Sequence, residues 1–262
     1  APFVQKNWNV LSVGKPGVDF FSGDTANWFY NRELYSGLKW NDLVSNLETA
    51  YEFALKQPGV DPNNIYLLGH SEATHVLVDF LKKGHKVKGI FFLGFLGTNM
   101  LEIAKWQVYR MYVEKWIKTD VDTNNNGVIE ESEAKKWAEF PAEWNGLTVS
   151  QIQEALNSDP ENKKAVEQFV RQRLYEGVFD RTDIYEEVAK LTPDVYILNG
   201  AKDMQTPLWQ VTPALESEKK AGKTNIKLIT FEDLGHGFSP PKGPRAHPVL
   251  DPSLGPIDSK VT

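Results

Sequence analysis

The sequence contains no cysteine among its 262 residues. Disulfide bonds, thiolate catalysis and cysteine-based zinc sites are therefore excluded, although the absence of cysteine does not settle the cellular compartment. Positive charge is also scarce, since 29 Lys and Arg against 35 Asp and Glu give a net charge of -6 with no basic patch. Such a chain offers nothing to phosphate backbones, so we expect no nucleic-acid partner. No apolar run is long enough for a membrane-spanning helix, so we expect no membrane span.

The length and the hydrophobic content bound the architecture. At 41% hydrophobic residues, 262 residues can bury one sizeable core together with a small inserted segment. No internal repeat is visible, which argues against a solenoid or propeller. We therefore expect one domain that carries an insertion.

The strongest motif is a tight strand-to-helix turn around Ser71. An apolar run ends at Leu68 and is followed directly by Gly-His-Ser-Glu-Ala at residues 69–73. This pattern is typical of a strained turn that presents a nucleophilic serine. Such a turn leaves no room for large side chains two residues before or after the serine, which makes Gly69 and Ala73 the sensitive positions. Alanine stands where a second glycine is usual, so some added strain is expected.

Two later segments place an aspartate and a histidine after strands. The run Val195–Gly200 is a predicted buried strand, and Asp203 lies in the polar turn behind it. A second predicted strand, Ile226–Phe231, precedes His236, whose flanking glycines let the side chain project from a tight loop. Taken singly, Asp203 also fits a helix N-cap and His236 also fits a surface loop.

The order Ser71, Asp203, His236, each just past a strand, resembles the α/β-hydrolase family from near Asn9 to about Gly255. The resemblance implies an α/β fold, with a mostly parallel sheet flanked by helices and a helical cap insertion. It also implies that the backbone amide of Glu72 is one oxyanion donor, and that no organic cofactor is needed.

The three residue types suit acyl transfer. A serine hydroxyl is a poor nucleophile at neutral pH, so Ser71 needs a base, and a histidine side chain titrates near neutrality. Asp203 would orient the imidazole of His236 and stabilise its charged form. We expect a serine hydrolase that acts on a small-molecule carboxylic ester through an acyl-enzyme. A peptidase or thioesterase of the same fold stays open, as does a calcium-binding protein on a hydrolase scaffold with impaired catalysis.

A second motif, at residues 122–133, matches the EF-hand calcium loop at its constrained positions, with Gly127 at the sharp turn and Ile129 at the apolar position. Only three side-chain ligands are carboxylates, so we expect a structural site with weak affinity, about 10⁻⁵ to 10⁻³ M. The alternative is a solvated Asn-rich turn between helices. The expected Ca²⁺ ligands are Asp122, Asn124, Asn126, the Val128 carbonyl, Glu130 and Glu133.

The calcium loop bears on localisation. A site this weak would stay empty at cytosolic calcium levels, so we expect an exported protein, periplasmic or secreted, although the sequence shows no signal peptide.

The loop belongs to a predicted helical insertion. We expect the hydrolase core in two parts, 1–96 and 191–262, with a cap at 97–190. Apolar spacing predicts helices over Leu101–Lys118, from Glu131 to Glu139, and from Ser150 to about Leu174 with a break near Asp159. The insertion is rich in tryptophan. Large aromatic side chains can line an apolar substrate pocket or attach a small helical cap to its base, and we expect the second role for most of them. The residues concerned are Trp106, Trp116, Trp137 and Trp144.

The two ends of the chain differ from the family pattern. Asn9–Val13 is a predicted strand, and in the resembled fold the strand before it carries a loop that supplies half of the oxyanion hole. We find no counterpart in the sequence. The segment Leu254–Asp258 is similar to the approach to a closing helix that is absent. We expect an internal fragment, with a missing N-terminal segment that supplies the oxyanion loop; an architecture that departs from the family is the alternative.

Overall fold

The computed structural model describes residues 8–19, 29–111, 113–137, 140–173, 177–178 and 180–240. The predicted closing approach at Leu254–Asp258 lies outside these residues. The chain divides into two compact units. The first holds the described residues up to Met100 and from 177 to 240, and the second holds those from Leu101 to Arg173. The predicted insertion at 97–190 therefore extends further on its C-terminal side than the second unit does.

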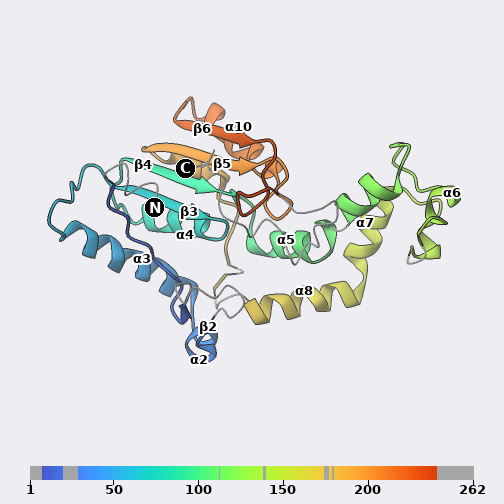
Figure 1. Cartoon of the computed structure of the whole chain (residues 1–262), viewed down its shortest axis with the longest axis horizontal. Coiled ribbons are helices and arrows are strands. Elements are labelled where there is room, and N and C mark those ends of the chain that lie inside the picture. The colour runs from blue at the N-terminus through green and yellow to red at the C-terminus, as the bar shows by residue number, and fades with distance from the viewer. Residues whose placement is uncertain are drawn as a thin grey trace. The chain divides into compact units, whose positions relative to one another are not determined.

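The first unit is built on a parallel sheet of four strands in the order β3-β4-β5-β6 (Figure 1). Helices lie between the strands along the chain, so the predicted α/β fold class is confirmed. The strands are β3 (Tyr66–His70), β4 (Gly89–Leu93), β5 (Asp194–Gly200) and β6 (Ile226–Phe231). The helices are α2 (Arg32–Ser36), α3 (Trp40–Leu55), α4 (Ala73–Lys82), α9 (Tyr185–Lys190), the 3-10 turn η4 (Leu208–Gln210) and α10 (Thr212–Lys220).

Buried apolar residues lie on both faces of this sheet: a first group surrounds Ile90 and Val195, and a second cluster on the other face contains Leu93, Leu198, Leu234 and Phe238. The register aligns Leu67 with Ile90 and Ile90 with Val195, and Ile90 and Val195 are fully buried. Helix α4 packs on this face, because a Cβ at Gly69 would lie 2.8 Å from Leu77 Cδ1. On the opposite face Leu68 is 53% exposed. Strand residues alternate between the two faces, so this pattern follows directly from the register.

The segment before the sheet corrects one prediction. Residues 9–13 form no strand, and the first ladder is the short antiparallel pair β1 (Val18–Asp19) and β2 (Phe29–Tyr30). Residues 8–15 and strand β3 instead line a common cavity of about 790 Å³. The two segments also touch, because the rings of Trp8 and Tyr66 pack edge to face with centroids 5.4 Å apart.

The second unit is helical. It contains α5 (Met100–Lys105), the π-helices η1 (Trp106–Arg110) and η2 (Val113–Val121), α6 (Glu131–Ala134), the 3-10 turn η3 (Ala142–Trp144), α7 (Val149–Ser158) and α8 (Pro160–Arg173). The predicted break near Asp159 falls between α7 and α8, at a proline that suits a first helical position. Its core cluster gathers the buried side chains of Ile117, Val121, Ile129, Phe140, Val149 and Ile152.

The helix predictions in this unit had different outcomes. The predicted helix Leu101–Lys118 is helical over its described residues, as the α-helix α5 followed by the π-helices η1 and η2. Ile117 and Val121 in η2 are fully buried. The predicted helix from Glu131 to Glu139 ends at Ala134.

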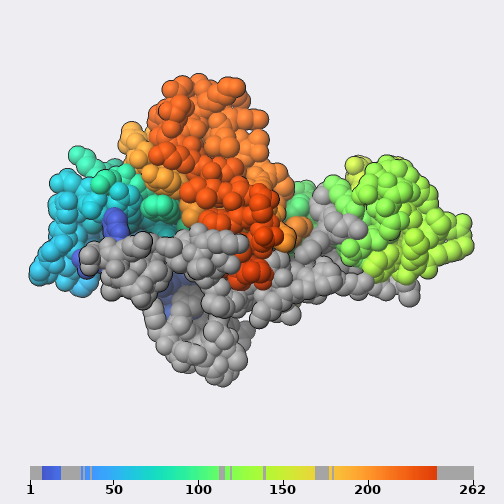
Figure 2. All heavy atoms as spheres, turned by 45° about the horizontal axis from the view of Figure 1, so that its top comes forward, coloured from blue at the N-terminus to red at the C-terminus, as the bar shows by residue number. Residues whose placement is uncertain are grey.

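Within the described residues, no helix is both long enough and apolar enough to cross a membrane. Figure 2 shows the surface of each unit. The first unit includes α3 in light blue and the segment from β5 to residue 240 in orange and red. The second includes the EF-hand-like loop at 122–133 and its neighbours in green.

Candidate active site

Ser71 lies at the sharp turn between β3 and α4. Its backbone φ is +57°, a left-handed conformation that a non-glycine residue adopts only under strain. The turn is held on both sides, because the Ser71 amide donates to the Leu93 carbonyl at 2.9 Å and the Thr74 hydroxyl donates to the Ser71 carbonyl at 2.8 Å. A Cβ at Gly69 would lie 2.8 Å from Leu77 Cδ1 and 3.1 Å from the Ala73 carbonyl oxygen, which shows why this position of the turn needs a glycine.

Asp203 lies in the turn after β5 and is almost fully buried. One carboxylate oxygen accepts the backbone amides of Gln205 at 2.9 Å and Thr206 at 2.8 Å. The other accepts from His236 Nδ1 at 2.9 Å and from the Thr206 hydroxyl at 2.8 Å. Asp203 closes its own turn and also faces the histidine, but it is not a helix N-cap, because the N-cap of the helical turn that follows, η4, is Pro207. Four donors fix the carboxylate in one orientation.

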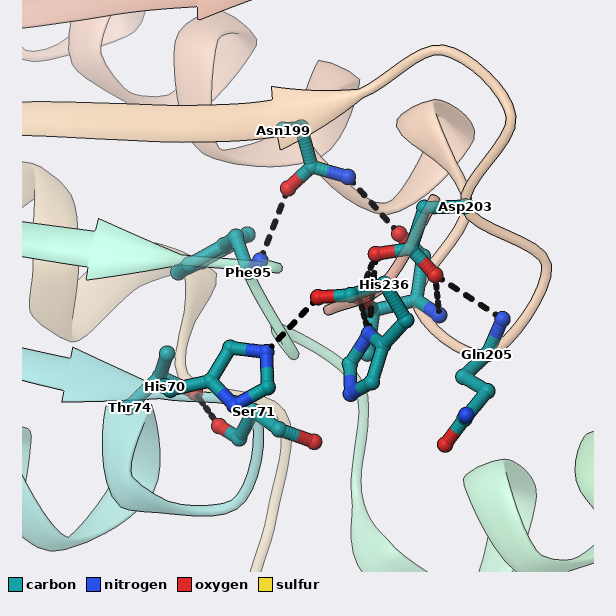
Figure 3. A network of polar contacts seen from close by, with 9 residues as sticks. His70, Ser71, Thr74, Phe95, Asn199, Asp203, Gln205 and His236 are labelled. Carbon is teal, nitrogen blue, oxygen red and sulfur yellow. Dashed lines mark hydrogen bonds and ion pairs between the residues drawn. The ribbon is translucent and has the colours of Figure 1, made fainter. Parts of the chain in front are cut away.

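His236 lies in the loop after β6 and is 7% exposed. Because Nδ1 carries the hydrogen that it donates to Asp203, the neutral ring leaves Nε2 free to accept a proton. Figure 3 shows the Ser71 side chain extending toward this ring. The structure thus pairs Asp203 with His236, and Figure 3 shows Ser71, from a segment far away along the chain, beside this pair.

Gly94, just past β4, supports the ring of His236 from behind. Its φ is +54°, and a Cβ there would lie 3.1 Å from both Cε1 and Nδ1 of His236 and 3.1 Å from the Thr206 hydroxyl. A side chain here would be strained at this φ and would also crowd the ring, so glycine suits the position best. Sequence reasoning missed Gly94, although a glycine directly after an apolar strand was an available signal.

Two further residues were missed. The Thr206 hydroxyl lies 3.2 Å from His236 Nδ1, so it contacts both partners of the Asp203–His236 pair. Asn199, fully buried at the end of β5, accepts the Phe95 amide at 2.8 Å and donates to the Thr206 carbonyl at 2.8 Å. It therefore ties the end of β4 to the turn that holds Asp203. An asparagine inside a predicted buried strand was the signal that could have found it.

Glu72, whose amide is the expected oxyanion donor, is the N-cap residue of α4. An amide at the start of a helix has no partner within the helix, so it is available for a developing negative charge. The Glu72 side chain forms an ion pair with Lys15.

The other histidines have different surroundings. His75 is fully buried on α4, and its Nε2 contacts the Thr98 carbonyl at 3.0 Å. Burial, aided by the charge of Arg181, lowers the pKa of His75 to about 4. His85 pairs with Glu48 at 2.9 Å. His247 lies outside the described residues.

In the EF-hand-like loop at 122–133, the carboxylates accept hydrogen bonds from the loop's own amide and hydroxyl groups. Asp122 accepts the amides of Asn126 at 3.1 Å and Gly127 at 2.9 Å. Glu133 accepts the Thr123 amide and hydroxyl, each at 2.8 Å. Both carboxylates are nearly inaccessible to solvent. Hydrogen bonds from Glu130 and then Thr123 outweigh burial and lower the pKa of Glu133 to about 2.

The side-chain amides of the two asparagines in this loop have the same orientation. Both Asn124 and Asn126 turn their Nδ2 toward the Glu130 carboxylate, at 3.0 and 2.5 Å. Their Oδ1 atoms accept loop amides, from Asn126 and Val128 respectively. Among the described residues, no three His, Cys, Asp or Glu side chains already converge as metal ligands. The predicted set of Ca²⁺ ligands therefore combines three carboxylates with two asparagine side chains and one backbone carbonyl.

A second segment pairs with this loop. Val128 bridges Thr148 in antiparallel fashion, with hydrogen bonds from Ile129 N to Leu147 O and from Val149 N to Gly127 O, each 3.0 Å. The sequence analysis did not anticipate this support. Of the four tryptophans, Trp106 is buried, and the other three pack against the core cluster of the unit: Trp116, Trp137 and Trp144.

No protein-family model and no curated protein matches this sequence. Solved structures show distant similarity. An alpha/beta hydrolase enzyme from a Medee basin deep-sea metagenome library is 12% identical, over 80% of this chain and 68% of its own, with a TM-score of 0.42. An esterase from Rhodococcus sp. is 18% identical, over 75% and 65%, with a TM-score of 0.39. A thermophilic esterase from Thermogutta terrifontis is 16% identical, over 76% and 66%, with a TM-score of 0.42. This chain spans about two thirds of the length of these structures.

Proposed function

We propose that this protein is a serine hydrolase that cleaves a small-molecule carboxylic ester through an acyl-enzyme. The observation that carries the proposal is the buried contact of 2.9 Å between Asp203 and His236, beside a serine in a strained left-handed turn. Strain of this kind persists where surrounding structure enforces it, and it is concentrated at functional sites. An ion pair that only stabilised the fold would not need a strained serine beside it, and a strained turn alone would not need a buried Asp–His pair.

The groups have defined roles in this mechanism. Ser71 Oγ attacks the ester carbonyl carbon while His236 Nε2 takes its proton, and the Glu72 amide stabilises the oxyanion. Collapse breaks the bond to the alcohol, which leaves with the proton from His236. Water then attacks the acyl-enzyme by the same route and releases the acid, which restores Ser71.

A complete oxyanion hole needs a second donor. We propose that it comes from a segment that adds to the outer edge of β3, where no strand pairs within the described residues. Loss of one such donor costs about two to three powers of ten in rate.

The proposal is tested with p-nitrophenyl esters of acetate, butyrate and octanoate. We expect Ser71→Ala to reduce hydrolysis to the background rate. Asp203→Asn should lower kcat by about 10⁴, because the neutral amide no longer holds the correct tautomer of His236. Ser150→Ala, at an exposed position on α7, is the matched control and should leave the rate unchanged. Equal rates for wild type and Ser71→Ala would reject the proposal; activity on amides or thioesters alone would move it to the peptidase or thioesterase alternative.

We also propose that the loop at 122–133 binds Ca²⁺ as a structural ion. The donor set fits, because the buried Asp122 and Glu133 carboxylates are accompanied by asparagine and carbonyl oxygens, the hard ligands that Ca²⁺ prefers. Asp122, Asn124, Asn126, the Val128 carbonyl, Glu130 and Glu133 would hold the ion, which would neutralise these carboxylates and fix the loop. Export from the cytosol follows as a proposal from the weak affinity expected of this set.

Thermal unfolding in CaCl₂ and in EDTA tests this second proposal. At a free Ca²⁺ concentration of about one hundred times Kd, binding stabilises the folded state by about 2.7 kcal/mol, which raises Tm. Glu133→Gln should abolish the increase. Glu131→Gln should keep it, because Glu131 is exposed and pairs with Lys135 outside the donor set. An identical Tm in both buffers would exclude the calcium site and leave the solvated turn.

A further inference from the structure

We propose that His70 is a positioning residue that holds the catalytic histidine loop over the nucleophile. This inference rests on the proposed hydrolase function. His70 is the last residue of β3 and directly precedes Ser71. Its Nε2 lies 2.9 Å from the backbone carbonyl of His236, 166 positions further along the chain. Figure 3 shows this contact beside the Asp203–His236 pair.

The chemistry of the contact defines its direction. A backbone carbonyl only accepts, so His70 Nε2 must carry a hydrogen and donate it. The bond acts on the backbone of His236 and leaves the Nδ1 of that residue to Asp203. The two imidazole rings also pack together, with centroids 4.5 Å apart and planes inclined by 38°. His70 therefore fixes both the main chain and the ring of the proposed base.

The geometry explains why this contact matters for the reaction. Ser71 moves with β3, whereas His236 belongs to a loop that follows β6 at the other end of the sheet. Asp203 and Thr206 position the ring of His236 but contact neither β3 nor Ser71 in the hydrogen bonds described above. The His70 bond joins the nucleophile turn to the base loop directly. A misplacement of about 1 Å between reacting groups costs up to a hundredfold in rate.

The side chain of His70 is suited to substitution because it is exposed, so its replacement does not open a core cavity. His70→Phe keeps an aromatic ring for packing but removes the donor. His70→Gln keeps an amide donor at a similar reach but removes the ring. His85→Phe is the matched control, because His85 pairs with Glu48 away from the site.

The experiment measures kcat and KM on p-nitrophenyl butyrate together with amide hydrogen exchange of residues 234–238. We expect His70→Phe to lower kcat about ten- to a hundredfold with KM nearly unchanged, and His70→Gln to recover most of that loss. Exchange in the loop should be faster in His70→Phe than in wild type, and close to wild type in His70→Gln.

Each result decides the matter. Wild-type kcat and loop exchange in His70→Phe, or equal losses in both variants, would overturn the positioning role. Hydrogen exchange does not depend on catalysis, so it tests the contact even if the wild type proves inactive, an outcome that would reject the proposed hydrolase function instead.

Discussion

Gly94 shows how closely single residues constrain this site. Its backbone lies against the imidazole of His236, with no space for a methyl group at its φ of +54°. We expect Gly94→Ala to reduce ester hydrolysis at least tenfold, because the ring must move away from the position that Asp203 and Thr206 fix. The rate on p-nitrophenyl butyrate measures this.

Gly59→Ala is the control for this prediction. Gly59 also has a positive φ, +79°, but nothing lies within 4 Å of a Cβ there. Both variants carry a similar backbone strain of about 1 kcal/mol or more, so Tm should fall comparably. A comparable loss of activity in the two would show that backbone strain, not displacement of His236, is responsible.

His75 makes stability depend on pH. Its pKa is about 4 in the folded protein and 6.5 when unperturbed, so the unfolded chain binds the proton more tightly. The folded state is therefore favoured above pH 6.5 and loses this contribution as pH falls toward 4, by about 3 kcal/mol in all. Urea unfolding of wild type and His75→Gln at pH 7.5 and 4.5 should show a smaller loss in the variant. His85→Gln should behave like wild type; equal losses in all three would contradict this account.

At the scale of single residues, the sequence selected Ser71, Asp203 and His236 as candidates because each follows an apolar strand with turn chemistry around it. It did not locate Gly94, Thr206, Asn199 or His70. Their roles depend on contacts between segments that only the packing of the sheet brings together. A residue such as Asn199 shows its polarity in the sequence, but not the Phe95 amide that it must satisfy.

At the scale of elements, the side chain of Ile129 packs the EF-hand-like loop at 122–133 into the core of the second unit. It is fully buried, and its amide bonds to the Leu147 carbonyl. We expect Ile129→Ala to lower the free energy of unfolding of this unit by about 2 to 5 kcal/mol through lost burial and a residual cavity.

Leu101→Ala, at a residue that is 40% exposed, is the matched control and should cost much less. Denaturant unfolding measures both changes. Similar losses would mean that the apolar position of the loop is not part of the core.

Elements with strong patterns were predicted well. β6 has the predicted bounds, and β5 begins within one residue of the prediction, because both segments are rich in β-branched and other apolar residues and are bounded by polar turns. The strand Asn9–Val13 was wrong, and the helix Leu101–Lys118 is helical but continues as π-helix after Lys105. Helical periodicity does not distinguish α from π turns over a few residues, and an apolar segment forms a strand only when a neighbour pairs with it.

At the scale of the whole molecule, the two compact units should differ in their response to calcium. The loop at 122–133 lies within the second unit, so Ca²⁺ binding would stabilise that unit. Differential scanning calorimetry in CaCl₂ and EDTA should show a heat-capacity transition that shifts and a second one that does not. A single transition that moves as a whole would show that the units unfold cooperatively. Ester hydrolysis by fully folded protein should be unaffected by chelation.

The central claim is that Ser71 is an activated nucleophile, and its most direct test is intact mass spectrometry after treatment with a fluorophosphonate. The account predicts one covalent adduct on the wild-type chain and none on Ser71→Ala. Folded wild-type protein that gains no adduct, or an adduct that persists in Ser71→Ala, would contradict it.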